Sequence, residues 1–455
     1  MSKRISVAVA LVGMCALSLL LPSCGNSSSR PSGLLYVLTQ GITDVNNGGP
    51  TVSSYAVNLN SGGLSLVNSS TSTCPTASTS GNLEPCGLPL DILLDSTGAT
   101  AFVLNQGVAV PVAPNPVVPP TIISYPINSD GSLGTPTAAL PTDAALPGTP
   151  IAMTRDSAGK FLFVLDVGSD TTACGLTPTV ACASISVFNM QSGSTTLSAV
   201  AGSPFPLGRI PSALSVIPFT APTGNTLPCA TTTDFLYITF NSDPALHNDN
   251  TLSAYCVDSS GVPNDLTPPP QSPYVTSPNP ISVLAVNTNP AGEISGGVFV
   301  YVGSQASHAG ALDIYDVCVA VGTAPCNSLA NIGQLIPVTS PTPPTPGQNP
   351  LQMVVDPTSE FLYVMCKDTS QVFAYKITTA SGALTALSGS ASLSTGSQPV
   401  SMALHASVGN TGQFLFTSNS ASSNVTGFSL NTLSGVMSAL PAETTTSVPS
   451  GMAVR

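Results

Sequence analysis

The sequence predicts an all-β protein, a seven-bladed β-propeller with four antiparallel strands in each blade. The first observation is composition, because only 7% of the residues are charged whereas 43 prolines and 39 glycines are spread along the chain. Such a chain favours short strands joined by many turns. The second observation is a strand-and-turn pattern that recurs seven times, and the third is that the two ends of the repeating region are complementary.

An aromatic strand lies in each repeat, with an apolar residue three positions before the aromatic one and another two positions after it. Side chains alternate between the two faces of a strand, so the aromatic residue and the later apolar residue share a face. The seven matches are Val52-Tyr55-Val57, Ile122-Tyr125-Ile127, Ile185-Phe188-Met190, Leu252-Tyr255-Val257, Leu312-Tyr315-Val317, Val372-Tyr375-Ile377 and Val425-Phe428-Leu430.

A continuous apolar run precedes each aromatic strand, as is typical of a strand buried on both faces. The runs begin at Leu34, Ala101, Phe161, Phe235, Val298, Phe361 and Phe414. After six of the seven aromatic strands, an x-Gly pair supplies the positive φ of a tight hairpin turn. In the fifth repeat, an insertion that holds Cys318 and Cys326 takes the place of this turn.

A proline opens the strand that completes each unit, and at the first residue of a strand a proline removes no ladder hydrogen bond. These prolines are Pro89, Pro150, Pro211, Pro280, Pro350, Pro399 and Pro449. A unit of roughly 60 residues with apolar faces needs neighbouring units to bury them. A closed propeller and an open solenoid both provide such neighbours.

The two ends of the repeating region decide between these arrangements. The region begins at Leu34 with an apolar run and ends with the proline strand at 449–455. A ring uses both ends, because the C-terminal strand becomes the innermost strand of a sheet whose other three strands are N-terminal. We therefore expect residues 34–455 to form one closed seven-bladed propeller.

These motifs resemble those of the YVTN/lactonase-like family of seven-bladed propellers. The resemblance rests on the apolar runs, on the Gly-x-x-Pro turns at 208–211, 347–350 and 396–399, and on the DVGSD segment at 166–170. It implies the propeller fold over the whole mature chain. The family includes lactonases related to 6-phosphogluconolactonase and muconate cycloisomerases, and also surface propellers without established catalysis. Its enzymes are expected to use His, Arg and Glu at the central channel.

The first 23 residues are typical of a bacterial lipoprotein signal peptide. Two basic residues precede an apolar stretch at 5–21, and the segment LPSCG resembles a lipobox in which Cys24 is lipidated and becomes the new N-terminus. Residues 24–33 would then form a flexible tether. An ordinary secretory signal and an uncleaved transmembrane anchor are the alternatives. Gly25 in place of Asp is the pattern of outer-membrane sorting in Gram-negative bacteria, so we expect an envelope protein facing the periplasm or the exterior.

The charge balance bears on the partners of the mature chain. Beyond residue 23 it keeps seven Lys and Arg against 21 Asp and Glu, which argues against nucleic acid as a partner. A phosphorylated substrate would need several cations, and only three arginines lie in the propeller region. A closed ring has little reason to self-associate, so we expect a monomer.

Nine cysteines lie beyond Cys24, and eight of them form close sequence pairs. In an oxidising compartment such pairs predict disulfides. The predicted bonds are Cys74–Cys86, Cys174–Cys182, Cys229–Cys256 and Cys318–Cys326. Zinc is the competing interpretation, although it favours Cys-x-x-Cys spacing or nearby histidines. Cys366 lies inside an apolar run and is expected to be a buried free thiol.

Polar residues can be sorted between the two faces of the ring. One face collects the loops entering the innermost strands and the loops between the second and third strands, and ligands usually meet this face. Asp95, Asp156 and Asp356 lie six residues after a strand-opening proline, which places them in turns on the opposite face, where Asp is a turn former. His405 shares their register and is therefore not favoured as a catalytic residue.

On the ligand-binding face, the predicted substrate-binding residues are Asp91, Asp166, Asp170, Gln352 and Lys367. His247 and His308 lie in equivalent loops of neighbouring repeats, and one of them could act as a general base on water while Arg209 stabilises an oxyanion. Exposed loop histidines are the alternative, and Asp166 and Asp170 could instead hydrogen-bond turns. We expect no cofactor and no metal; a metal site of His247, His308, Asp243 and Asp249 is the alternative interpretation.

Two functions are compatible with these residues. One is a lipid-anchored binding or interaction scaffold that presents its rim to a protein or a glycan. The other is a lactonase-like hydrolase that acts on a non-phosphorylated lactone at the channel mouth. The scarcity of His, Arg and Glu favours the scaffold, and the sequence does not decide whether the protein is an enzyme.

Overall fold

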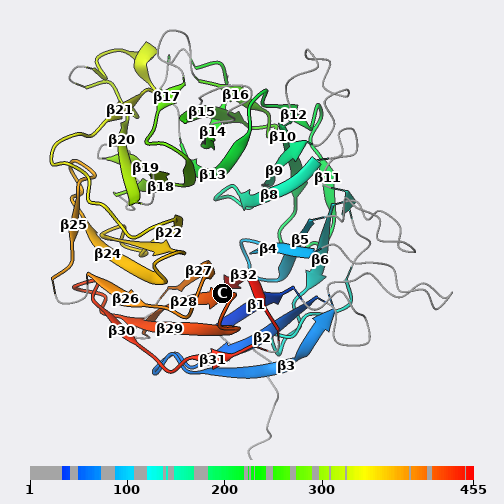
Figure 1. Cartoon of the computed structure of the whole chain (residues 1–455). Helices are drawn as coiled ribbons and strands as arrows, with labels where there is room; N and C mark the ends of the chain where they lie inside the picture. Colours follow the sequence, from blue (N-terminus) through cyan, green and yellow to red (C-terminus); the bar gives the residue numbers. More distant parts are fainter. Residues whose placement is uncertain are drawn as a thin grey trace, which may run out of the picture.

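The computed structural model describes residues 33–40, 50–72, 88–106, 120–136, 140–141, 148–168, 183–219, 224, 227–229, 231–241, 250–266, 273–288, 297–306, 309–322, 325–388, 391–406, 412–445 and 447–455. In this part of the chain the structure is almost entirely β, with one short 3-10 helix, η2 (Leu329–Asn331). The strands form seven separate antiparallel sheets arranged in a ring (Figure 1). The predicted seven-bladed propeller is confirmed.

Each sheet is one blade, numbered from the blade that contains β1. The innermost strands of blades 1 to 7 are β32 (Pro449–Val454), β4 (Leu88–Leu94), β8 (Gly148–Arg155), β13 (Pro211–Pro218), β18 (Pro280–Asn287), β22 (Pro350–Val355) and β27 (Pro399–His405). The second strands are β1 (Leu34–Thr39), β5 (Thr100–Gln106), β9 (Phe161–Gly168), β14 (Thr232–Phe240), β19 (Val298–Ala306), β23 (Phe361–Cys366) and β28 (Gln413–Asn419). The predicted apolar runs thus form the second strands.

The aromatic strands are the third strands of the blades. They are β2 (Thr51–Val57), β6 (Thr121–Pro126), β10 (Ala183–Met190), β15 (Thr251–Asp258), β20 (Ala309–Val317), β24 (Gln371–Ile377) and β29 (Asn424–Leu430). The outermost strands are β3 (Leu64–Ser72), β7 (Leu140–Pro141), β11 (Leu197–Ala199) with β12 (Phe205–Pro206), β16 (Pro263–Asp265) with β17 (Tyr274–Val275), β21 (Leu335–Pro337), β25 (Leu384–Ala386) with β26 (Ser392–Ser394), and β30 (Met437–Ala439) with β31 (Glu443–Thr444). Within the described ranges, the outermost strand of four blades is therefore split into two short pieces.

The two ends of the repeating region close the ring. The C-terminal strand β32 pairs antiparallel with β1, with Val37 opposite Met452, and this sheet runs in the order β3-β2-β1-β32. The predicted closure is confirmed. The strand-opening prolines also lie where expected, except that Pro89 and Pro150 are the second and third residues of their strands rather than the first.

Strand direction gives the ring two different faces. We call the side where the innermost strands begin, and where the second strand turns into the third, the mouth face. The opposite side, which carries the turn after each innermost strand and the hairpin after each third strand, is the turn face. On it, Asp95 accepts the backbone N–H groups of Ala99 and Thr100 at 2.7 and 3.1 Å, and Asp356 likewise accepts that of Phe361 at 2.7 Å. Their predicted role as turn formers is confirmed.

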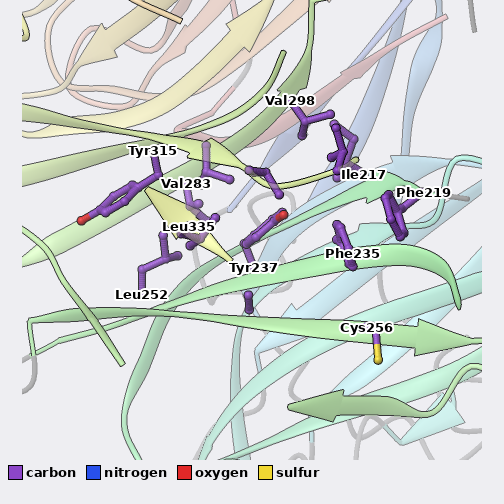
Figure 2. Close-up of a cluster of buried hydrophobic side chains, with 14 of the residues drawn as sticks. Ile217, Phe219, Phe235, Tyr237, Leu252, Cys256, Val283, Val298, Tyr315 and Leu335 are labelled. Atoms are coloured by element: carbon purple, nitrogen blue, oxygen red, sulfur yellow. The ribbon is translucent and has the colours of Figure 1, made fainter. Parts of the chain in front are cut away.

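The hydrophobic core is divided among the gaps between neighbouring blades. Figure 2 shows the cluster between blades 4 and 5, where Phe235 and Tyr237 of β14 face Val283, Tyr315 and Leu335 of the next blade. Six further clusters occur among the described residues. Both faces of each second strand are consequently buried, which explains why each of these strands contains a continuous apolar run.

A tyrosine in the second strand ties several neighbouring blades together. Its hydroxyl donates to the carbonyl of the hairpin glycine in the next blade, at 2.9 Å in each case: Tyr36 to Gly131, Tyr301 to Gly382 and Tyr363 to Gly435. In blade 4 the equivalent residue is Tyr237, and its buried hydroxyl has no hydrogen-bond partner among the described residues. The reason is that blade 5 carries the insertion between β20 and β21 in place of the glycine hairpin.

Two of the four predicted disulfides are present. Cys229 is bonded to Cys256 and Cys318 to Cys326, while Cys366 is a buried free thiol, as predicted. Burial raises the pKa of this thiol to about 12, so it is a poor nucleophile near neutral pH. The other two pairs, Cys74–Cys86 and Cys174–Cys182, lie outside the described residues.

The proposed signal peptide (1–23), Cys24 and most of the tether (24–33) also lie outside the described residues, and stay predictions. In the part of the chain that the structure describes, no helix has the length and hydrophobicity needed to span a membrane.

Candidate functional site

The mouth face contains a ring of seven residues, each two positions after a strand-opening proline. We call this ring the collar; its members are Asp91, Ala152, Ala213, Ser282, Gln352, Ser401 and Gly451. In all seven blades the pairing register between the innermost and second strands shifts at this position. A bulge re-aims the side chain at such a shift, so the collar position is set by the backbone of each blade.

Asp91 supplies the single carboxylate on the seven innermost strands, all of which are described. Its Oδ1 accepts the backbone N–H of Ile92 at 2.8 Å, and its carboxylate also accepts the backbone N–H of Met153 in blade 3. Burial raises the pKa of Asp91 to about 6, although these two hydrogen bonds favour the ionised form. The group can therefore exchange a proton close to neutral pH.

Two neutral collar residues make the same bond between blades. Gln352 Oε1 accepts the backbone N–H of Met402 at 2.6 Å, and Ser401 Oγ accepts that of Met452 at 3.2 Å. These residues show that the inter-blade bond needs no negative charge. The negative charge of Asp91 is therefore not required by the structural bond that this position makes.

Arg209 lies in the loop that leads into β13, and its guanidinium turns toward its own blade. Nη1 donates to Thr251 Oγ1 at 3.1 Å and Nη2 donates to Ser253 Oγ at 2.7 Å. The guanidinium carbon lies 4.0 Å from the centre of the Phe240 ring. Burial raises the pKa of nearby Tyr255 to about 12, and the positive charge of Arg209 opposes that rise.

Asp166 is packed below the mouth rather than exposed on it. The side chain is 1% exposed, and its Oδ2 accepts a hydrogen bond from Ser186 Oγ at 2.9 Å. A Cβ atom on Gly148 would lie 2.8 Å from the Cβ of Asp166, so only glycine fits beside it. These contacts favour the structural role that the sequence left open for this residue.

Lys367 begins the hairpin between β23 and β24 on the mouth face. Its backbone N–H donates to the carbonyl of Asn349 at 2.9 Å. The next residue, Asp368, accepts hydrogen bonds from Gln305 and Asn349, each at 3.4 Å. Gln305 belongs to blade 5 and Asn349 to the loop entering blade 6, so this group links two blades at the mouth.

His247, His308, Asp170, Asp243 and Asp249 lie outside the described residues. The convergence of the two histidines with Arg209 and the alternative metal site both stay predictions. Within the described ranges, no group of three or more His, Cys, Asp and Glu side chains could hold a metal ion.

The structure also brings forward two carboxylates that the sequence analysis did not single out. Asp313 accepts hydrogen bonds from the backbone N–H of Ser277 at 2.7 Å and from the Ser277 hydroxyl at 2.9 Å. It occupies the strand position that Ser253 occupies in blade 4, so a comparison of the repeats would have found it.

Asp234 is 2% exposed, and its Oδ1 has no partner among the described residues. Burial, and secondly the charge of Asp156, raise the pKa of Asp234 to about 6.

These features define a closed seven-bladed propeller whose innermost wall is largely aliphatic and whose mouth carries a collar of small and polar residues. No protein-family model matches the chain, and no curated protein matches it. Several solved structures, in contrast, superimpose on the chain. A candidate 6-phosphogluconolactonase from Bacteroides fragilis superimposes with a TM-score of 0.56 at 11% identity, covering 93% of this chain and 98% of that one.

Two other solved structures give similar values. The periplasmic gluconolactonase of Pseudomonas aeruginosa has a TM-score of 0.56 at 16% identity, with 92% of this chain and 99% of that chain covered. A protein from Lactobacillus plantarum has a TM-score of 0.54 at 12% identity, covering 93% and 99%. At these identities the likeness establishes a shared fold, that of the lactonase-type propellers, and leaves the activity open.

Proposed function

We propose that the protein is a lipid-anchored, extracytoplasmic propeller that acts as a binding scaffold and is held in the cell envelope through Cys24. The observation that carries the scaffold role is the orientation of Arg209. Its guanidinium binds Thr251 and Ser253 of its own blade and stacks on Phe240. An arginine held in this way fixes the mouth of the ring, and two of its five N–H donors are directed into its own blade instead of toward a developing oxyanion.

The other polar groups of the mouth support the same role. Gln352 and Ser401 accept backbone N–H groups of the next blade, and Asp368 links blades 5 and 6. These bonds favour a rigid mouth and rim, and a preorganised surface suits a protein or glycan partner. The two disulfides support an oxidising compartment, which agrees with a lipoprotein in the outer membrane.

A panel of non-phosphorylated lactones tests the scaffold against hydrolysis. The mature protein is incubated with each lactone, and acid release is titrated beside the His247→Ala, His308→Ala double variant. We expect neither protein to exceed the spontaneous rate. Robust turnover by the wild type would overturn the scaffold, and its loss in the double variant would assign the catalysis to the two histidines.

One observation favours the second candidate, a lactonase-like hydrolase. Asp91 lies on the innermost wall with a pKa raised by burial to about 6, which suits a general base near neutral pH. The likeness to a periplasmic gluconolactonase fold is compatible with this activity. If turnover is found, the Asp91→Asn variant identifies the base: Gln352 shows that a neutral amide can keep the inter-blade bond, so a loss of turnover in a folded variant would report the missing proton acceptor.

The anchor has its own test. The full chain and a Cys24→Ser variant are expressed in a Gram-negative host, and the membrane and soluble fractions are separated. The wild type should fractionate with membranes and carry a lipid-modified N-terminal peptide by mass spectrometry. A wild type that stays soluble and unmodified would refute the lipoprotein assignment.

A further inference from the structure

The point at which the chain enters the ring has a fixed place on the turn face. Gly33 accepts the backbone N–H of Val57 at 2.9 Å, and Leu34 accepts that of Arg455 at 2.9 Å. A Cβ atom on Gly33 would lie 2.7 Å from Leu59 Cδ2, so this residue is packed against the hairpin of blade 1. The start of β1 therefore belongs to the rigid turn face and not to a loose extension.

The distance from Cys24 to this point is limited by the length of the chain. Nine residue steps separate Cys24 from Gly33, and a fully extended chain of that length reaches about 30 Å. A blade strand of seven residues, such as β29, is about 20 Å long. If the mouth face lay on the membrane, the tether from Cys24 would have to span the height of the blade, the depth of the turns and the path around the rim of the ring. That span would require the tether to be stretched almost to its limit, which loses conformational entropy.

A second feature of the turn face points to a lipid surface. Leu433 is 90% exposed at the tip of the hairpin between β29 and β30, in the blade next to the entry point. The hairpin is held by the bond from Gly435 N to Asn431 O at 2.7 Å and by that from Leu433 N to Asn431 Oδ1 at 3.0 Å. A large apolar side chain fixed at the tip of a turn gains by entering the boundary between lipid headgroups and acyl chains.

We propose that the turn face of blades 1 and 7 lies against the lipid surface, with Leu433 at the headgroup boundary, and that the mouth face is presented to the aqueous phase. This inference rests on the proposed lipid anchor at Cys24. It gives the scaffold a direction, because a partner would then approach the collar from the side away from the membrane.

The absence of tryptophan from the chain allows a direct test with single-tryptophan variants. Leu433→Trp reports on the turn face. Ala421→Trp is the matched control: it lies in the mouth-face hairpin between β28 and β29 of the same blade, and its side chain is exposed. Each full-length, lipid-anchored variant is reconstituted into liposomes whose phosphatidylcholine headgroups carry a spin-label quencher. Cys24→Ser versions of both variants give the background.

The Leu433→Trp fluorescence should be quenched several-fold more than that of Ala421→Trp. Equal quenching, or stronger quenching of Ala421→Trp, in protein that floats with the liposomes would overturn the orientation and leave the anchor standing. Failure of the wild-type chain to float with the liposomes would refute the anchor, and with it this orientation. Far-UV circular dichroism that matches the wild type establishes that both variants are folded.

Discussion

The tyrosine bonds between blades allow one stability prediction with a control inside the same molecule. Tyr363 and Tyr237 occupy the same position in the second strands of blades 6 and 4, and both are buried. The Tyr363 hydroxyl donates to the Gly435 carbonyl at 2.9 Å, whereas the Tyr237 hydroxyl has no partner in the part of the chain that the structure describes. Replacing each tyrosine by phenylalanine removes one oxygen atom from the same strand position in two blades.

The two substitutions should change the free energy of unfolding with opposite signs. Tyr363→Phe deletes a buried hydrogen bond and leaves the Gly435 carbonyl short of a donor, which costs about 1–2 kcal/mol. Tyr237→Phe removes a hydroxyl that was desolvated without compensation. It should leave stability unchanged or raise it by up to about 1–2 kcal/mol. The two variants should therefore differ by roughly 2 kcal/mol.

Urea unfolding of the disulfide-intact protein, followed by tyrosine fluorescence and far-UV circular dichroism, measures this difference. The two probes must give coincident transitions, and the m-values must match the wild type, for the midpoints to report stability alone. Tyr301→Phe should follow Tyr363→Phe, because it loses the same bond to Gly382. A destabilisation by Tyr237→Phe as large as that by Tyr363→Phe would refute the reasoning, since it would mean that the hydroxyl in blade 4 is satisfied.

Two further predictions concern the hairpin glycines and a buried carboxylate. Gly435 and Gly193 both have positive φ, but an added Cβ on Gly435 would lie 2.3 Å from Phe361, whereas one on Gly193 meets nothing within 4 Å. Gly193→Ala should therefore cost about 1–2 kcal/mol of stability, and Gly435→Ala should cost about 1–3 kcal/mol more. Equal urea midpoints for the two variants would contradict the inter-blade packing. Asp234 has a folded-state pKa of about 6, above its usual 3.8, so the stability that its protonated form provides is complete below pH 4 and is lost as the pH rises through 6. Relative to Asp234→Asn, the wild type should lose about 2–3 kcal/mol between pH 4 and pH 8; a constant difference across that range would show that the carboxylate is ionised throughout.

The fold could be predicted because its determinants are local and repeated seven times. The spacing of the aromatic strand fixes one face, the apolar run fixes a strand buried on both sides, and the glycine and proline positions fix the turns. Closure could be predicted from two segments alone, the run at Leu34 and the strand at 449–455. What the sequence did not reveal is the break in the outermost strand, because each of its pieces has only two or three residues and carries no periodic signal.

The mouth was harder to predict because side-chain direction depends on residues far away in the chain. The sequence correctly places Arg209 at the entrance of an innermost strand. Its guanidinium, however, binds Thr251 and Ser253, which lie more than forty residues later in the chain. No local sequence pattern predicts these partners. For Gln352, likewise, the partner is a backbone group of the following blade. The face on which Arg209 and Gln352 lie was predictable, but their hydrogen-bond partners were not.

The departure of blade 5 from the repeat explains why the Tyr237 hydroxyl lacks the glycine carbonyl that the equivalent tyrosines bind. Where other blades turn at a glycine, this blade carries an insertion between β20 and β21, which contains the Cys318–Cys326 disulfide. The insertion contributes Ile332 to the apolar cluster around Tyr237, so the loss of one hydrogen bond is accompanied by extra buried hydrophobic area. A buried Ile contributes about 2 kcal/mol, more than the bond it replaces. The irregular blade can therefore be as stable as its neighbours, and the ring tolerates one unit whose turn is free to take another shape.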